Sequence, residues 1–319
     1  MTNIYRPEGH LFGERENREY ISSRSGLDRA FEEGRILEAT ALLCDSHMRL
    51  HVDLYGMTGI IEKNEVIYSP DSREPKDIAV ITRVGKPVCF KVMGFAWEGG
   101  KEVAILSRRE AQKECLTQHL FDMTPGDVLE AKVTHLDSFG AFVDVGCGVI
   151  SLLSIDCISV SRISHPSDRL TVGDSIWTAV KSIDRVSGRI FVTMRELLGT
   201  WLENAKEFEV GQTVAGIVRS VESYGIFVEL APNLAGLAEI RDGTDDVRFA
   251  KVGQCVAVYI KSIIPDKMKI KLVLIDSYGT EPPNTKLHYY IDVQSTKHID
   301  RWQYSPHYSS KAIETVFCE

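Results

Sequence analysis

The feature that most constrains the fold of this chain is a repeated pattern of short alternating segments. Three segments open with a glycine and continue with a run in which apolar and polar residues alternate; they start at Gly34, Gly126 and Gly211. The second and third repeats also share their internal spacing, because an aromatic residue follows at the same distance from each glycine, at Phe139 and Tyr224. Such self-similarity predicts several copies of one small structural unit.

Each repeat ends in a predicted β-hairpin. Residues 176–183 and 189–194 alternate around the turn 184–188, and residues 257–264 and 268–275 do the same around 265–267. With an opening strand, an aromatic strand and a middle strand (149–155 and 235–240), each repeat has about five strands. That is the count of a small OB-type barrel. We predict a mainly β chain of three tandem five-stranded barrels of this type, joined by short helices at 27–33, 107–120 and 200–208.

The repeats also divide the chain into regions. Residues 1–33 are an N-terminal extension, of which residues 1–26 are polar and uneven and are expected to be partly flexible. Residues 34–112, 126–200 and 211–276 are the three predicted barrels. Residues 277–319 form a tail with the aromatic residues Trp302 and Tyr304 and a strand-like segment at 287–293, and we expect this tail to pack on the third barrel.

The formal net charge of −8 disfavours a protein that binds nucleic acid mainly through positive charge. It is compatible with a protein that binds a single strand by stacking bases on aromatic rings in a local basic groove. The apolar and charged fractions, 44% and 26%, are ordinary for a folded chain.

Several functional classes find no support in the sequence. No P-loop, GxSxG, HExxH or dinucleotide motif occurs, so we expect no enzyme, no cofactor and no small-molecule substrate. The seven cysteines are widely spaced without a CxxC pair, which disfavours disulfides and a metal site; Cys318 alone is expected to be reactive. No secretory leader and no long apolar run is present, so we expect a cytoplasmic protein without membrane contact.

The aromatic pair Phe139 and Phe142 is the sharpest candidate binding feature. On a regular strand, residues three apart point to opposite faces, but Gly140 between them permits a bulge or bend that brings both rings to one surface. The pair recurs at Tyr224 and Phe227. The alternative is that one or both rings fill the barrel core.

Residues 126–195 resemble a ribosomal S1 RNA-binding domain. The resemblance is carried by Gly126-Asp127-Val128, Ser138 to Asp144, His165 to Asp168, Val172-Gly173-Asp174 and Asp184 to Arg189. Residues 211–276 are similar with an altered middle loop, and residues 34–109 match in outline only. The chain as a whole resembles a short bacterial member of the ribosomal S1 family.

The resemblance implies which residues contact RNA. The two family aromatics match Phe139 and Phe142, and Tyr224 and Phe227, whereas the family histidine is replaced by Ser154 and by about Glu239. The acidic and basic residues of the last hairpin match Asp184 and Arg189, and more loosely Asp266 and Lys269; solvated hairpin charges are the alternative. His165, in a long loop with Arg162 and Arg169, is a further expected contact, unless it is simply exposed to solvent.

The first repeat departs from this pattern. At the aromatic positions it has His47 or Met48, and Leu50 or His51, so no stacking pair exists. A barrel that docks on a protein such as the ribosome, and a structural spacer, both remain open.

Together these observations predict a single-stranded RNA-binding protein that holds mRNA at the small ribosomal subunit, associated with the ribosome in the cytoplasm. One alternative is a ribosome- or polymerase-associated module whose barrels contact protein. Another is an accessory subunit of an RNA-processing enzyme.

Overall fold

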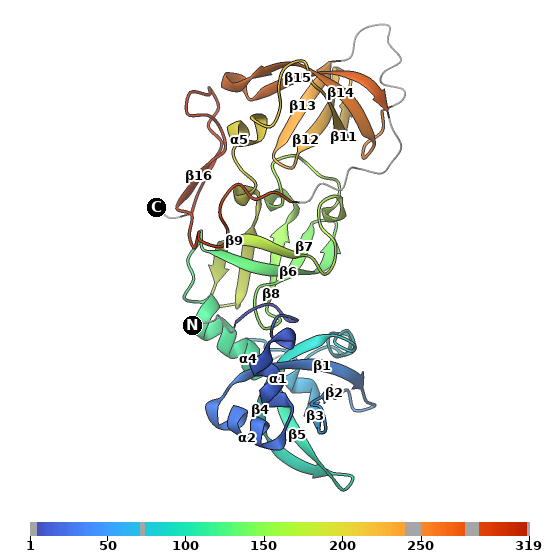
Figure 1. The fold of residues 1–319 in the computed structure, drawn as a ribbon, viewed down its shortest axis with the longest axis vertical. Coiled ribbons are helices and arrows are strands. Elements are labelled where there is room, and N and C mark those ends of the chain that lie inside the picture. Colours follow the sequence, from blue (N-terminus) through green and yellow to red (C-terminus); the bar gives the residue numbers. More distant parts are fainter. Residues whose placement is uncertain (1–4, 71–73, 240–249, 278–286, 318–319) are drawn as a thin grey trace.

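The computed structural model describes residues 5–70, 74–239, 250–277 and 287–317. Three sheets of five strands each close into a barrel, and the barrels follow one another along the long axis of the molecule (Figure 1). The mainly β class and the presence of OB-type barrels are therefore confirmed.

The strands have the following bounds. The first barrel contains β1 (Ile36–Cys44), β2 (Leu50–Asp53), β3 (Thr58–Ile61), β4 (Pro87–Glu98) and β5 (Lys101–Ser107). The second contains β6 (Val128–Asp137), β7 (Gly140–Asp144), β8 (Ile150–Ser154), β9 (Ser175–Asp184) and β10 (Arg189–Thr193). The third contains β11 (Thr213–Glu222), β12 (Gly225–Ala231), β13 (Leu234–Glu239), β14 (Cys255–Ile264) and β15 (Lys269–Ser277).

Helices and short turns connect these strands. The helices are α1 (Arg15–Ile21), α2 (Arg24–Glu33), α3 (Asp77–Ile81), α4 (Arg108–Cys115) and α5 (Trp201–Ala205). A π-helical turn, η3 (Leu116–Leu120), extends α4, and single 3-10 turns are η1 (Leu11–Gly13), η2 (Lys63–Glu65), η4 (Ile155–Cys157), η5 (Pro166–Asp168), η6 (Arg195–Leu197) and η7 (Pro265–Lys267). The predicted helical linkers at 107–120 and 200–208 thus lie where α4 with η3, and α5, are found.

All three barrels use the same pairing scheme. The strand orders are β1-β2-β3-β5-β4, β6-β7-β8-β10-β9 and β11-β12-β13-β15-β14, and in each the third and fifth strands are parallel. The register of the first strand shifts by one residue at the same place in each barrel, next to Ala41, Val133 and Val218. Such bulges bend a strand and help a small sheet to close.

A Val-Gly pair occurs once in each repeat, at Val84-Gly85, Val172-Gly173 and Val252-Gly253, and its glycine supports the bulge of that barrel. Gly85, Gly173 and Gly253 adopt φ values of 76°, 101° and 86°, and their amides donate to the carbonyls of Ala41, Val133 and Val218 respectively. A residue with a side chain is strained at such φ values, which explains glycine at this point of every repeat. The glycines that open the repeats are less uniform. Gly126 and Gly211 lie just before the first strand of their barrels, and their amides donate to the carbonyls of Val180 and Ile260 at equivalent positions. Gly34 is instead the left-handed C-cap of α2.

The N-terminal segment is packed between the first two barrels (Figure 1). The buried Glu8 carboxylate accepts from both Arg108 Nε (2.6 Å) and Cys89 N (3.0 Å), and its own amide donates to Asp144 Oδ2 at 2.7 Å. Lys132 Nζ donates to the Glu8 carbonyl. The carboxylate, amide and carbonyl of Glu8 thus all have partners in the first two barrels and α4, so this segment helps to hold the two barrels together.

The C-terminal tail spans the second and third barrels. Trp302 and Tyr304 belong to the apolar core of the third barrel, and Tyr304 Oη donates to the Asn233 carbonyl at 2.6 Å. The strand-like reading of residues 287–293 is wrong. Leu287 and Tyr289 instead pack against the core of the second barrel. The tail strands lie later, as the pair β16 (Arg301–Gln303) and β17 (Glu314–Val316).

Candidate nucleic-acid interface

The aromatic pair of the second barrel forms an exposed ring cluster. Phe139 is 50% exposed, and its ring meets that of Phe142 edge-to-face with centroids 5.8 Å apart. Phe139 lies in the turn before β7 rather than on the strand, so strand alternation does not apply to it. The expected bulge at Gly140 is absent, and the bulge lies in β6 instead. Glycine is required at 140 because a Cβ would lie 2.5 Å from the Leu153 carbonyl oxygen.

Phe142 is the centre of a row of side chains that crosses the barrel. Its register partners are His135 on β6 and Leu152 on β8, and Leu152 pairs in turn with Phe191 on β10. The His135 ring stacks on Phe142 with centroids 6.0 Å apart and an interplanar angle of 26°. Because alternate strand residues face outward, these four side chains form one apolar and aromatic surface on the outside of the barrel.

Polar groups lie on both sides of this row. On one side, Ser154 pairs with Gly140 beside Phe139, and Lys181 Nζ lies 3.1 Å from the sulfur of the neighbouring Cys157. On the other side, Arg189 is exposed two residues before Phe191 and pairs with Asp184. Both sides therefore carry a cation that can meet a phosphate of an RNA strand lying across the row.

Asp184 has a local structural role. Its carboxylate accepts from the Ser187 hydroxyl at 2.5 Å and from the amides of Val186 and Ser187, so it shapes the hairpin turn that carries Arg189. The hydroxyl of Ser187 is the largest of the contributions that lower the pKa of Asp184. Asp184 therefore stays ionised beside Arg189.

The third barrel repeats the ring pair with a different charge pattern. Tyr224 is 60% exposed in the turn before β12, and its ring meets that of Phe227 edge-to-face at 6.3 Å. Phe227 pairs with Leu237, which pairs with Lys271, so Lys271 occupies the place that Phe191 has in the second barrel. Its Nζ donates to Glu239 at 2.9 Å, which reduces the positive charge of this face.

The predicted basic residue Lys269 lies at the start of β15, opposite Ile264. It therefore occupies the place of Arg189 in the second barrel. Asp266 lies in η7, within the preceding turn, as Asp184 lies before its own turn. Glu239 pairs with Gly225 as Ser154 pairs with Gly140, so both stand at the same strand position.

The first barrel has no ring pair at the equivalent place. His51 stands at the position of Phe142, paired with Leu43 and Ile60, and its Nε2 lies 3.1 Å from the Asp45 carboxylate. The exposed aromatics of this barrel include Tyr55, 58% accessible between β2 and β3, and Trp97, 75% accessible on the long β4–β5 hairpin that projects from the end of the molecule (Figure 1).

His165 lies at the joint between the second and third barrels. Its Nδ1 accepts from the Ser167 amide and caps η5, whose Asp168 carboxylate forms an ion pair with Arg219 of β11 at 3.2 Å. The adjacent Arg169 donates twice to Glu229 of β12, at 2.6 and 2.8 Å. The loop is thus fixed to the third barrel, and His165 is not part of the row around Phe142.

Three contributors to the second-barrel surface were missed from the sequence: His135, Phe191 and Lys181. Phe191 could have been found, because it follows Arg189 by two and so shares its strand face. His135 requires knowledge of the bulge next to Val133, and Lys181 reaches the surface from the register shift in β9, and neither shift has a sequence signal.

In the part of the chain that the structure describes, no group of three or more His, Cys, Asp or Glu side chains is arranged to hold a metal ion. The six described cysteines are all free thiols, and Cys318 lies outside the described residues. Among the described helices, none has the length and apolar character needed to span a membrane.

Comparison with protein families identifies the second barrel. A family model described as "S1 RNA binding domain" matches residues 122–195. The resemblance read from Gly126 to Arg195 is therefore confirmed, and the matched stretch contains the Phe139–Phe142 pair and the Asp184–Arg189 turn.

Curated relatives carry the likeness further along the chain. The small ribosomal subunit protein bS1 of Staphylococcus aureus (strain COL) is 31% identical over 219 residues, which cover 63% of this chain and 55% of the relative. The bS1 protein of Staphylococcus saprophyticus is 34% identical over 178 residues, covering 54% of this chain and 44% of the relative. The chain spans about half the length of the curated relatives it matches. These relatives are ribosomal proteins rather than enzymes.

Among solved structures, the chain is similar to GSP13 from Bacillus subtilis. That match has 28% sequence identity and covers 23% of this chain and 57% of the other, with a TM-score of 0.22.

Proposed function

We propose that this chain, which contains an S1 RNA-binding domain and is related to the bacterial ribosomal protein bS1, binds single-stranded messenger RNA during translation at the small ribosomal subunit. It acts by binding, without catalysis, in the cytoplasm and in association with the ribosome. The observation that carries the proposal is the exposed edge-to-face ring pair of Phe139 and Phe142 within the matched domain.

Ring stacking supplies most of the binding in this proposal. An exposed ring contributes about 1–3 kcal/mol when a base stacks on it, whatever the base, which suits a protein that must accept many messages. Phe139 and Phe142 provide the stacking surface, and His135 backs the Phe142 ring. Arg189 and Lys181 bind phosphates on the two sides of the row, while Asp184 holds the turn of Arg189 in place.

The third barrel contributes a second, weaker site through Tyr224, Phe227 and Lys269. Its weakness follows from Glu239, which neutralises Lys271 and repels phosphate at the position where the second barrel has Ser154. The three barrels are proposed as tandem S1-type units, with the first adapted to another task.

A protein-binding role is favoured for the first barrel. Its face has His51 hydrogen-bonded to Asp45 in place of an aromatic pair, and its hairpin exposes Trp97 at the end of the molecule. This role belongs to the alternative in which a barrel contacts the ribosome or another protein partner, and it adds to RNA binding by the other two.

The proposal is tested by titrating a fluorescent, unstructured RNA with the intact chain and with the double variant Phe139→Ala, Phe142→Ala. Loss of two stacking rings should weaken binding at least about tenfold, because each ring contributes on the order of 1 kcal/mol or more. Phe31→Ala is the matched control, since Phe31 is also about half exposed (48%) but lies on α2. Equal affinity of the double variant and the control would refute the stacking mechanism.

A further inference from the structure

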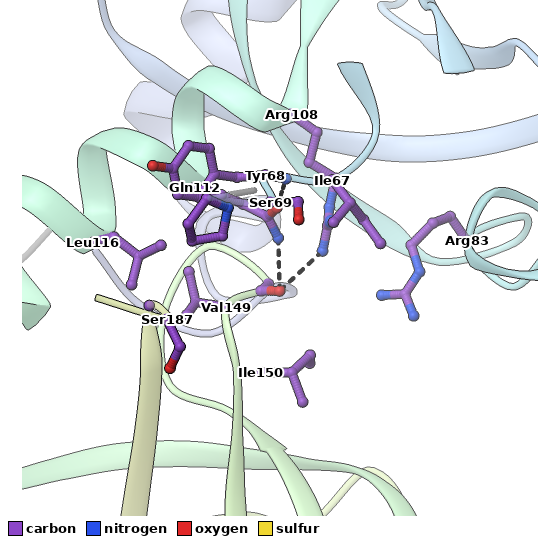
Figure 2. Close-up of a pocket in the computed structure, with 13 residues that line it drawn as sticks. Ile67, Tyr68, Ser69, Arg83, Arg108, Gln112, Leu116, Val149, Ile150 and Ser187 are labelled. Atoms are coloured by element: carbon purple, nitrogen blue, oxygen red, sulfur yellow. Dashed lines mark hydrogen bonds between the residues drawn. The ribbon is translucent and has the colours of Figure 1, made fainter. Parts of the chain in front are cut away.

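A pocket of about 330 Å³ lies between the first and second barrels. Figure 2 shows Arg108 and Gln112 of α4 meeting the Gly148 carbonyl, with Tyr68 and Leu116 to one side and Ile150 below. The lining from the first barrel and α4 is Ile67 to Pro70, Arg83, Arg108, Gln112 and Leu116; the lining from the second barrel is Gly148 to Ile150, Ser187 and Gly188. This volume is at the lower end of the range for ligand sites.

The pocket opens at one end of the second-barrel surface. Ile150 is the first residue of β8 and alternates outward with Leu152, the partner of Phe142. Ser187 and Gly188 belong to the turn that carries Arg189. Because β8 and β10 are parallel, Ile150 and Arg189 stand level with each other, two residues before Leu152 and Phe191. A strand lying along the Phe139–Phe142 surface toward Arg189 therefore arrives at the pocket.

The charges around the pocket leave one cation incompletely matched. Arg108 is satisfied, because it donates to both Glu8 carboxylate oxygens and to the carbonyls of Val66 and Gly148. Arg83 shares the same Glu8 at 3.7 Å, and in the described part of the chain its buried Nε has no hydrogen-bond partner. Burial and the neighbouring Arg108 lower the pKa of Arg83. Two arginines thus share the Glu8 carboxylate, with the Asp144 carboxyl as a second nearby acid, and an anion beside Arg83 would accept from its unpartnered Nε.

The remaining walls suit a flat, mostly apolar group. The half-buried ring of Tyr68 and the side chains of Leu116, Val149 and Ile150 provide apolar surface, and the Ser187 hydroxyl lies at the turn. A nucleobase combines a flat apolar face with polar edges, and the phosphate of the nucleotide provides an anionic acceptor for the Arg83 Nε.

We propose that this inter-barrel pocket binds one nucleotide of the RNA strand as it leaves the second-barrel surface, with the base among the apolar walls and the phosphate at Arg83. The inference rests on the proposed function, since it extends the path of the same strand. It makes the junction with the first barrel part of the RNA site, although the outer face of that barrel has no stacking pair.

The experiment compares the intact wild-type chain with Arg83→Gln on two unstructured RNAs, one of about four and one of about sixteen nucleotides, spanning the range for a single OB-type domain. The short RNA is covered by the Phe139–Phe142 surface, so its affinity should be unchanged. The long RNA reaches the pocket, and its affinity should fall about tenfold, the effect of one lost charged hydrogen bond. Arg18→Gln is the control, because it makes the same charge change at an exposed site on α1.

A second pair of variants guards against a folding defect in Arg83→Gln. Ile150 is 43% exposed, so both Ile150→Asp and Ile150→Lys leave the core intact. If an RNA phosphate lies close to residue 150, the aspartate variant should weaken binding of the long RNA, because the two negative charges repel, and the lysine variant should preserve or strengthen it.

The outcomes separate the two proposals. If the wild-type chain binds both RNAs and none of the pocket variants changes the affinity for the long one, the pocket assignment is overturned and the RNA-binding proposal stands. If the wild-type chain binds neither RNA, the proposed function itself fails. If AMP or UMP alone, titrated without RNA, binds the wild type and not Arg83→Gln while the long RNA binds both equally, the pocket is a free-nucleotide site and the strand path is wrong.

Discussion

At the scale of single residues, the surface of the second barrel depends on where each ring is attached. Phe139 is in a turn and Phe142 is on a strand, so their rings meet without any distortion of β7. The sequence predicted the pair and its exposed ring, but assigned the cause to a bulge at Gly140. The actual bulge lies across the hairpin in β6, and it brings His135 opposite Phe142.

Two buried carboxyl groups near the first junction predict a pH dependence of stability. Desolvation raises the pKa of Glu38 to about 7 and that of Asp144 to about 7. In the unfolded chain both titrate near pH 4, so between about pH 4 and 7 the folded chain holds protons that the unfolded chain has released. Stability should therefore fall as the pH rises through this window. The thermal midpoint should be higher at about pH 5.5 than at about pH 8.

The control for this prediction is Asp144→Asn. The amide cannot accept from all three amides that now donate to the carboxylate, those of Glu8, Gly146 and Gly148, so overall stability should drop. Its pH slope should also be shallower, because one of the two titrating groups is gone. Burial lowers the pKa of His119, so this group makes stability rise with pH near pH 6. Its effect is opposite to that of the two carboxyl groups, which together should outweigh a single histidine. If the thermal midpoint of the variant changed with pH as steeply as that of the wild type, Asp144 would not contribute to the pH dependence.

At the scale of elements, the junction between the first two barrels depends on a close approach at Gly148. A Cβ there would lie 1.8 Å from Arg108 Nη2, and the residue has a φ of +75°. Gly148→Ala should therefore displace the Arg108–Glu8 pair and destabilise the chain by clearly more than backbone strain alone. Gly173→Ala is the matched control: its φ is +101° with no atom within 4 Å of a Cβ, so only strain of about 1–2 kcal/mol is expected. Equal losses in thermal unfolding would contradict the junction assignment.

The joint between the second and third barrels depends on a buried network around Glu229. Arg169 and Arg219 both donate to it, and all three side chains are at most 6% exposed. Glu229→Gln leaves the buried Arg169 without its carboxylate and Arg219 with only Asp168, which should destabilise the third barrel by about 3–5 kcal/mol. The exposed pair of Arg301 and Glu314 is the comparison, since Glu314→Gln should change stability by at most about 1 kcal/mol. Chemical denaturation measures the free energy of unfolding of both variants, and equal losses would contradict a stabilising role for the network around Glu229.

The strands were more predictable than their connections. Alternation located the hairpins of the second and third barrels to within about two residues, because one face of each strand is buried. Residues 287–293 were misread because their alternation resembles that of a strand, whereas their backbone pairs singly with a distant segment, as the Tyr290 amide does with the Leu197 carbonyl. Contacts between distant segments leave no local pattern, so the inter-barrel pocket had no sequence signal at all.

At the scale of the whole molecule, the barrels are joined differently at each end of the second one. The N-terminal segment and α4 fix the first barrel, while the loop 155–174 and the C-terminal tail fix the third (Figure 1). The proposed stacking surfaces therefore belong to one connected body, whose net charge of −8 leaves the rings, rather than overall charge, to hold the RNA.

The most direct test of this account is ultraviolet crosslinking of the intact chain to an unstructured RNA, followed by mass spectrometric mapping of the modified peptides. The account predicts crosslinked nucleotides at Phe139 and Phe142, and a weaker set at Tyr224 and Phe227. Crosslinks confined to the first barrel around Trp97, or spread without preference over the surface, would contradict the central claim that the second barrel binds RNA through its ring pair.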